Sequence, residues 1–134
     1  MKITVIKKTE TAVRVLLGIL IVISGVNKFG YWINVAYMED ALNFVVNFSN
    51  LGGGPFIYAM AILEILLGLA LLLNKFKILA ILALIPLLVS ILAFHIFLDL
   101  KGILIAAIVF SMNLILLFIH INKVSKIFSI NDTD

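Results

Sequence analysis

Cysteine is absent from this sequence of 134 residues, and proline, histidine and charged residues are scarce. Without a cysteine, the chain alone cannot provide disulfide exchange, a catalytic thiolate or the usual ligands of an iron–sulfur cluster. Only 13% of the residues are charged, and no catalytic motif is recognisable among them. The sequence therefore leaves open whether the protein is an enzyme.

Hydrophobic residues, in contrast, make up 64% of the chain, which is far more than a soluble domain of this size contains. The lysines lie at the ends of apolar runs and not on one polar face, so the net charge of +3 does not indicate binding to nucleic acid. We expect residues 1–134 to form a single domain of a small integral membrane protein, with the lipid bilayer as its partner. The sequence does not set the oligomeric state.

Four apolar runs are long enough to cross a bilayer, because a helix rises about 1.5 Å per residue and the hydrocarbon core is about 30 Å thick. They cover about residues 11–30, 55–74, 78–98 and 103–121. Between the first two runs, residues 37–48 have an amphipathic pattern that is typical of a helix lying at the membrane surface. The sequence predicts an all-α, four-helix membrane bundle with a short interfacial helix between the first and second spans.

Cations are distributed unevenly between the two ends of these spans. Eight of the ten Lys and Arg residues lie near the N-terminus, between the second and third spans, or after the fourth, whereas Lys28 and Lys101 lie at the opposite ends. Positive residues favour the cytoplasmic side of a membrane. We therefore expect a multi-pass protein of the inner (cytoplasmic) membrane with both termini in the cytoplasm.

The second span carries one carboxylate, Glu64, near its middle. Its leucine, isoleucine and phenylalanine residues contribute about −3 to −7 kcal/mol to membrane insertion, against about +3 kcal/mol for a central charge. The span can therefore insert, but nothing about crossing a membrane requires the carboxylate. We expect Glu64 to face the bundle interior, with Asn113 or Lys28 as its partner on another helix.

Other polar residues are expected near the same side of the bundle. His95 and Asp99 lie one helical turn apart at the end of the third span, and Asn113 lies at about the depth of Glu64 in the fourth. With Lys28 they form a predicted ladder of polar groups from one membrane surface inward. This ladder has two interpretations. It forms a pocket or proton-handling site for a lipophilic molecule such as a quinone, or its hydrogen bonds only hold the helices together.

A metal site is a further alternative, since His95, Asp99 and Glu64 are residue types that bind metals. Dedicated haem or zinc sites have more histidines at depth, and only His95 qualifies here. The second histidine, His120, lies near the end of the fourth span, where we expect it to be in water. We therefore predict no metal site and no resident cofactor, with a quinone as the ligand left open.

Glycines mark the expected contact between the first two spans. Arg14, Gly18, Ile21, Gly25 and Lys28 fall on one stripe of the first helix. Small residues on one stripe let a neighbouring backbone approach closely, while the cations at its two ends extend towards water. We predict that Gly18 and Gly25, with Gly68 of the second span, are helix-packing residues.

These motifs, in this order, resemble those of the DoxX-like family of small membrane proteins. The matching stretches are Arg14 to Gly18, Ser24 to Phe29, Glu64 to Leu73, and Phe94 to Asp99 with Gly102, and the resemblance covers about residues 11–122. It implies a four-helix, bacterial-type inner-membrane protein with cytoplasmic termini. It also implies an association with quinol or thiosulfate:quinone oxidoreductase systems, for which members of the family are named.

Three functions are compatible with these observations. The first is an accessory or ligand-binding subunit linked to a quinone-related membrane oxidoreductase, whose other subunits would be its partners. The second is an enzyme or transporter acting on a quinone or another small molecule. The third is a purely structural subunit of a larger membrane complex.

Overall fold

The computed structural model describes residues 2–30, 43, 46–98 and 100–129, and every regular element within them is helical. The long helices are α1 (Lys2–Gly30), α3 (Gly54–Leu73), α4 (Lys77–Leu98), α5 (Ile103–Ile119) and α6 (Ile121–Ser129). Two short helical turns, η2 (Ser49–Gly53) and η3 (Leu100–Gly102), precede α3 and α5. The predicted all-α fold is confirmed, whereas most of the interfacial segment predicted at residues 37–48 lies outside the described residues.

Three helical segments are long and apolar enough to cross a membrane. They are α1, the stretch Val46–Leu73 that contains α3, and α4. Helix α5, with 17 mostly apolar residues, is the fourth candidate for a crossing, and it ends at Ile119, where a bend of 69° separates it from α6. The chain is therefore a multi-pass membrane protein.

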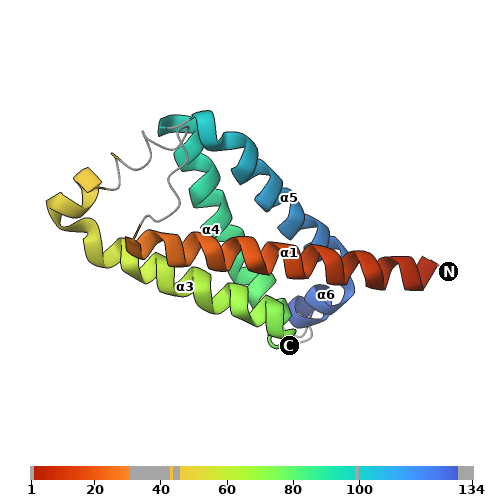
Figure 1. Ribbon diagram of the computed structural model, residues 1–134. Helices are drawn as coiled ribbons and strands as arrows, with labels where there is room; N and C mark the ends of the chain where they lie inside the picture. The colour runs from red at the N-terminus through yellow and green to blue at the C-terminus, as the bar shows by residue number, and fades with distance from the viewer. Residues whose placement is uncertain (1, 31–42, 44–45, 99, 130–134) are drawn as a thin grey trace.

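Helix α1 begins at Lys2, well before the span expected from residue 11. Residues 3–8 contain neither glycine nor proline, and Glu10 and Arg14 form an ion pair one turn apart within the helix, so nothing stops the helix at residue 9. The first turns project beyond the rest of the bundle, and residues 2–9 are all exposed (Figure 1).

The boundaries of α3 follow from its terminal residues. Pro55 occupies the first turn, where its missing N–H would have no helical partner in any case. Asn74 ends the helix in the left-handed conformation (φ 56°), and its N–H bonds to the carbonyls of Ala70 and Leu71. The tight turn that follows reverses the chain into α4.

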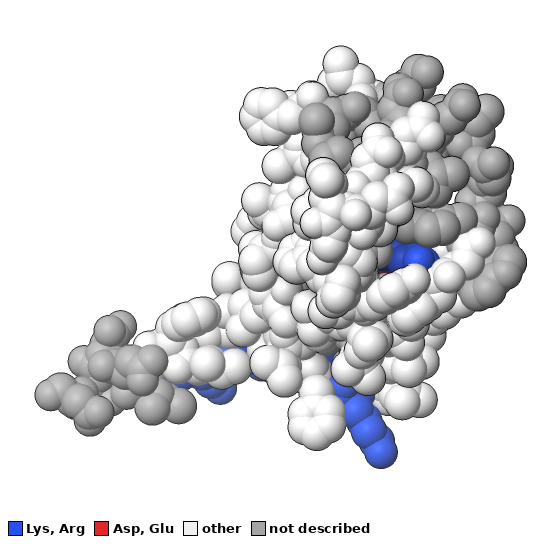
Figure 2. Space-filling model, turned by 90° about the vertical axis from the view of Figure 1, so that its left-hand side faces the viewer, with Lys and Arg blue, Asp and Glu red and all other residues white. Residues whose placement is uncertain are grey.

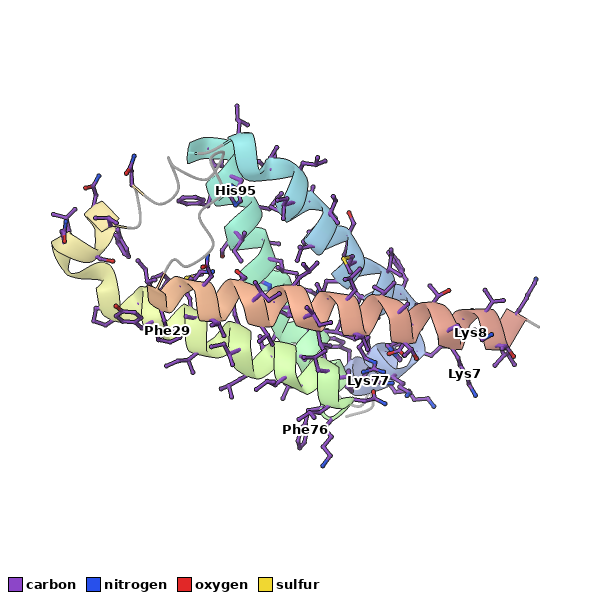
Figure 3. The ribbon with its side chains drawn as sticks, in the orientation of Figure 1. Lys7, Lys8, Phe29, Phe76, Lys77 and His95 are labelled. Atoms are coloured by element: carbon purple, nitrogen blue, oxygen red, sulfur yellow. The ribbon has the colours of Figure 1, made fainter. Side chains whose placement is uncertain are left out.

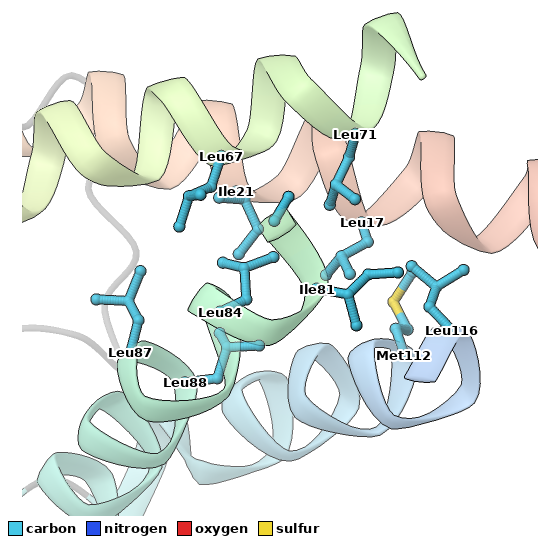
Figure 4. Close-up of a cluster of buried hydrophobic side chains, with 11 residues drawn as sticks. Leu17, Ile21, Leu67, Leu71, Ile81, Leu84, Leu87, Leu88, Met112 and Leu116 are labelled. Atoms are coloured by element: carbon cyan, nitrogen blue, oxygen red, sulfur yellow. The ribbon is translucent and has the colours of Figure 1, made fainter. Parts of the chain in front are cut away.

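Helices α1 and α3 run antiparallel and side by side, and α4 and α5 form a second pair that crosses them (Figure 1). Leucine and isoleucine side chains from all four helices meet at this crossing (Figure 4). The buried cluster comprises Leu17, Ile21, Leu67, Leu71, Ala80, Ile81, Leu84, Leu87, Leu88, Met112 and Leu116. Asn113 is buried within this apolar centre, and the charged groups that pair with one another lie on either side of it, one set towards each end of the bundle.

Candidate functional site

A buried ion pair joins α1 to α3. The ammonium Nζ of Lys28 lies 3.1 Å from Oε1 and 2.9 Å from Oε2 of Glu64. Ser24, one turn before Lys28, completes the group, because its hydroxyl accepts from Lys28 (3.1 Å) and donates to Oε2 of Glu64 (3.4 Å). The cluster of Ser24, Lys28 and Glu64 is thus closed by its own hydrogen bonds.

The backbone of α1 places this cluster. Ser24 and Lys28 share one face because they are four residues apart, and Gly25 lies beside them against α3. A Cβ atom added at Gly25 would lie 2.7 Å from the carbonyl oxygen of Ala61 and 3.1 Å from Cβ of Glu64. The absence of a side chain at Gly25 therefore lets the stem of Glu64 approach α1.

The two charged groups differ in their access to the surface. The side chain of Glu64 has no exposed area, whereas that of Lys28 is 24% exposed. Figure 2, which views the molecule from the left-hand side of Figure 1, shows Lys or Arg atoms recessed in a hollow of the upper part of the surface, whereas the other blue atoms in this view lie towards the lower end. A molecule arriving from the surface would therefore reach Lys28 first and Glu64 only through it.

Chemically, this cluster can bind an oxygen acceptor. The three hydrogens of the Lys28 ammonium have three acceptors in the cluster, so a carbonyl or carboxylate oxygen would bind by replacing one of the two oxygens of Glu64, while Ser24 and the other oxygen keep theirs. The carboxylate keeps the site neutral overall, so an uncharged ligand is compatible with it. The phenyl ring of Phe29 and the ring of Tyr58, stacked at 5.4 Å, lie next along the same two helices.

Asn113, the other partner considered for Glu64, does not bond to it. Its side chain is fully buried in α5, and its Nδ2 donates to the carbonyl of Ile81 in α4 at 3.1 Å. Its Oδ1 has no hydrogen-bond partner in the described structure. Asn113 thus links α4 to α5 and leaves one buried acceptor unused.

The remaining predicted site residues are His95 and Asp99. His95 is buried near the end of α4, where its ring meets Phe94 edge to face at 5.4 Å (Figure 3). Asp99 lies outside the described residues. Within the described part of the chain, no three His, Asp or Glu side chains come together as metal ligands would.

A second polar cluster, at the opposite end of the bundle, was missed by the sequence analysis. Oε1 of Glu10 is the common acceptor, at 3.0 Å from Nε of Arg14, 3.3 Å from Nε2 of His120 and 3.7 Å from Nζ of Lys77. Arg14 also donates to the carbonyl of Leu71 at the end of α3. We call these four residues, Glu10, Arg14, Lys77 and His120, the Glu10 cluster.

The Glu10 cluster corrects two expectations. Arg14 does not extend into water but is 6% exposed, and His120, expected in water, is 8% exposed. Burial lowers the pKa of His120, and the nearby Lys77 and Lys123 lower it further, although the hydrogen bond and charge of Glu10 oppose them. The spacing of Glu10 and Arg14, one helical turn apart, could have indicated their ion pair from the sequence. The contact of Glu10 with His120 could not be predicted in this way, because it joins positions 110 residues apart.

Comparison with known proteins gives one finding. The family model described as DoxX matches residues 10–96, a range that contains Ser24, Lys28 and Glu64 and ends before Asn113 and His120. No curated protein and no solved structure matches the chain.

Proposed function

The chain belongs to the DoxX family of membrane proteins, and from this premise we propose that it is an accessory subunit that binds a small lipophilic molecule at Lys28 and Glu64. The chemical class that fits is a quinone, which is apolar enough to reside in the bilayer and carries carbonyl oxygens that accept hydrogen bonds. The association with a quinone-linked oxidoreductase follows from the same family resemblance. We place the protein in the inner membrane with both termini in the cytoplasm, because the distribution of cations favours this orientation.

The observation that supports a binding role is the position of a full ion pair in an apolar bundle. Burying two charges costs several kcal/mol per ion before their attraction is counted, and apolar side chains of similar volume are often as stabilising. Helices α1 and α3 already have a close contact through Gly18, Gly25 and Gly68. Holding these two helices together therefore does not require Lys28 and Glu64.

One observation favours a second candidate, a purely structural subunit. The Ser24–Lys28–Glu64 cluster satisfies all of its own hydrogen bonds without a ligand. A closed cluster of this kind also suits a site that only fixes the register of α1 against α3. The two candidates differ in whether the side chain of Lys28 can be replaced without losing a bound molecule.

The test is purification of the intact protein from its native membranes, followed by solvent extraction and quantification of quinones per polypeptide. We expect a near-stoichiometric quinone with the native chain and at least a tenfold loss with Lys28→Gln. Lys75→Gln, at an exposed position at the opposite end of the bundle, is the matched control and should retain the quinone.

Melting temperatures in detergent separate binding from folding, because Lys28→Gln must melt as a folded protein for its loss of quinone to count. If Lys28→Gln does not fold, Ser24→Ala is tested in its place, because this variant leaves both charges present. Ser24→Ala should then lower the quinone content. Equal quinone content in the native chain and the folded variants would overturn the proposal. A co-purified membrane subunit without any quinone would favour the structural candidate.

A further inference from the structure

Helix α6 separates its residues sharply into an apolar and a polar side. At 100° per residue, its four apolar residues fall within an arc of about 120°. They are Ile121, Val124, Ile127 and Phe128. The two lysines, Lys123 and Lys126, lie on the remaining arc together with Asn122, Ser125 and Ser129.

The bundle covers only a small part of the apolar side of α6. Val124 is buried, whereas Ile121, Ile127 and Phe128 are 44%, 48% and 60% exposed. An apolar side that the rest of the chain does not cover, backed by lysines, is the pattern of a helix that lies in the plane of a membrane surface.

The orientation of α6 agrees with that position. Its axis turns by 69° from α5, so a helix that follows a spanning segment runs closer to the membrane plane than to the membrane normal. The bend occurs at His120, whose ring is held by Glu10 of α1 and whose carbonyl accepts from the N–H of Val124. The Glu10 cluster thereby fixes the direction in which α6 leaves the bundle.

The positive charge at this end of the bundle favours contact with an anionic membrane surface. Lys77 lies close to α6 through the Glu10 cluster, Lys75 is in the preceding turn, and Lys7 and Lys8 are on the projecting part of α1 (Figure 3). Among the described residues at this end, the only acidic one is Glu10, which is buried and paired. Asp132 and Asp134 follow in the sequence and leave a clear excess of positive charge.

From this geometry we propose that α6 docks on anionic lipid headgroups, with Ile127 and Phe128 inserted at the boundary of the acyl chains and Lys123 and Lys126 bound to phosphates. A second copy of the chain is a poorer occupant, because it would bring the same cluster of lysines to the contact. Lysines within a short distance of an anionic membrane surface are attracted to it, which favours this orientation of α6.

The native chain has no cysteine, so single spin labels report on chosen sites without further changes. Labels at Ile127→Cys and Ser125→Cys, on opposite sides of α6, are compared in nanodiscs of phosphatidylcholine mixed with phosphatidylglycerol. We expect the label at 127 to be accessible to oxygen and shielded from a water-soluble nickel complex, and the label at 125 to show the reverse. Equal access of nickel to both labels, or shielding of 127 from both reagents, would overturn the docking on lipid.

The preference for anionic lipid is tested by counting lipids that stay bound to the intact protein in native mass spectrometry. Lys123→Gln/Lys126→Gln should retain about tenfold less phosphatidylglycerol, while Lys123→Arg/Lys126→Arg, which keeps both charges, should match the native chain. Unchanged retention in the glutamine variant, with a melting temperature equal to that of the native chain, would refute the anionic preference. Loss in the arginine variant as well would refute a contact based on charge.

Discussion

At the scale of single residues, the pairing of Lys28 with Glu64 determines what substitution does. Removing one partner leaves an uncompensated charge in the apolar bundle, whereas removing both leaves none. We expect Lys28→Met to lower the free energy of unfolding by about 3 kcal/mol, and Lys28→Met/Glu64→Leu to recover most of that loss. Denaturation in detergent of both single variants and the double variant gives the coupling energy directly.

The recovery in the double variant is the informative result. If Lys28→Met and Glu64→Leu were additive, the two side chains would not interact in the folded protein, and the site described above would be wrong. Ile19→Leu, on an exposed position of the same helix, provides the control for a change that should have little effect.

His120 gives the molecule a dependence on pH. Its pKa is lowered in the folded protein, so the folded state binds a proton less readily than the unfolded chain, in which the ordinary value is about 6.5. The contribution of His120 to the free energy of unfolding is therefore fully present above about pH 6.5, and it is lost as the pH falls from there towards the lowered pKa of the folded state. The groups that face the ring are Glu10 of α1, Lys77 of α4 and Lys123 of α6.

We accordingly expect the melting temperature to fall between pH 7.5 and pH 5.5, a range in which an exposed carboxylate stays ionised. His120→Gln keeps a donor for Glu10 but does not titrate, so this variant should melt at the same temperature at both pH values. A fall of equal size in the variant would assign the effect to another group.

The sequence predicted part of this residue-scale description. The depth of Glu64 in an apolar run shows that it needs a partner, and Lys28 was one of two candidates because its long stem reaches inward. Ser24 was missed, since a serine in a span is common and its role depends on the rotation of α1 against α3. His120 was missed because its contact with Glu10 exists only once the first and last helices meet.

At the scale of helices, the contact of α1 with α3 depends on glycine. A Cβ at Gly25 would lie 2.7 Å from a backbone oxygen of α3, which cannot move alone, whereas at Gly18 the nearest atom is a side-chain carbon of Leu72 at 2.9 Å. We expect Gly25→Ala to destabilise the bundle by about 1 to 3 kcal/mol, and Gly18→Ala by less, because the backbone atom nearest to a Cβ at Gly18, the carbonyl oxygen of Gly68, lies at 3.0 Å. Thermal denaturation in detergent measures both.

Gly54 supplies the matched control for these two substitutions. It has helical backbone angles, and a Cβ there would have only one neighbour, at 4.0 Å. Gly54→Ala should be neutral or stabilising by up to about 1 kcal/mol. If all three alanine variants melted alike, the close approach of α1 and α3 would not contribute to stability.

The sequence located the helices well and their ends less well. The apolar runs placed α3 and α4 to within a residue or two, because glycine, proline and asparagine mark their ends. It did not predict that α1 starts at Lys2, since the β-branched residues 3–6 between lysines are also compatible with an extended segment. It also did not predict the bend at His120, which tertiary contacts with Glu10 hold in place.

At the scale of the whole molecule, the orientation in the membrane is open to a direct experiment. The proposed topology places Lys75, in the turn between α3 and α4, on the cytoplasmic side, and Asn50, before α3, on the other. In intact cells, an impermeant thiol reagent should label Asn50→Cys and not Lys75→Cys. Labelling of only the cysteine at position 75 would reverse the orientation, and both sites should react after the cells are opened.

The pairing of α1 with α3 and of α4 with α5 has a consequence for biosynthesis, because each pair consists of long helices that follow one another along the chain. Lys28 is synthesised before Glu64, so the partner of its charge is present only once α3 has been made. The second hairpin then adds to the first. The bond between His120 and Glu10 can form only after the second hairpin has been made, because 110 positions separate the two residues along the chain.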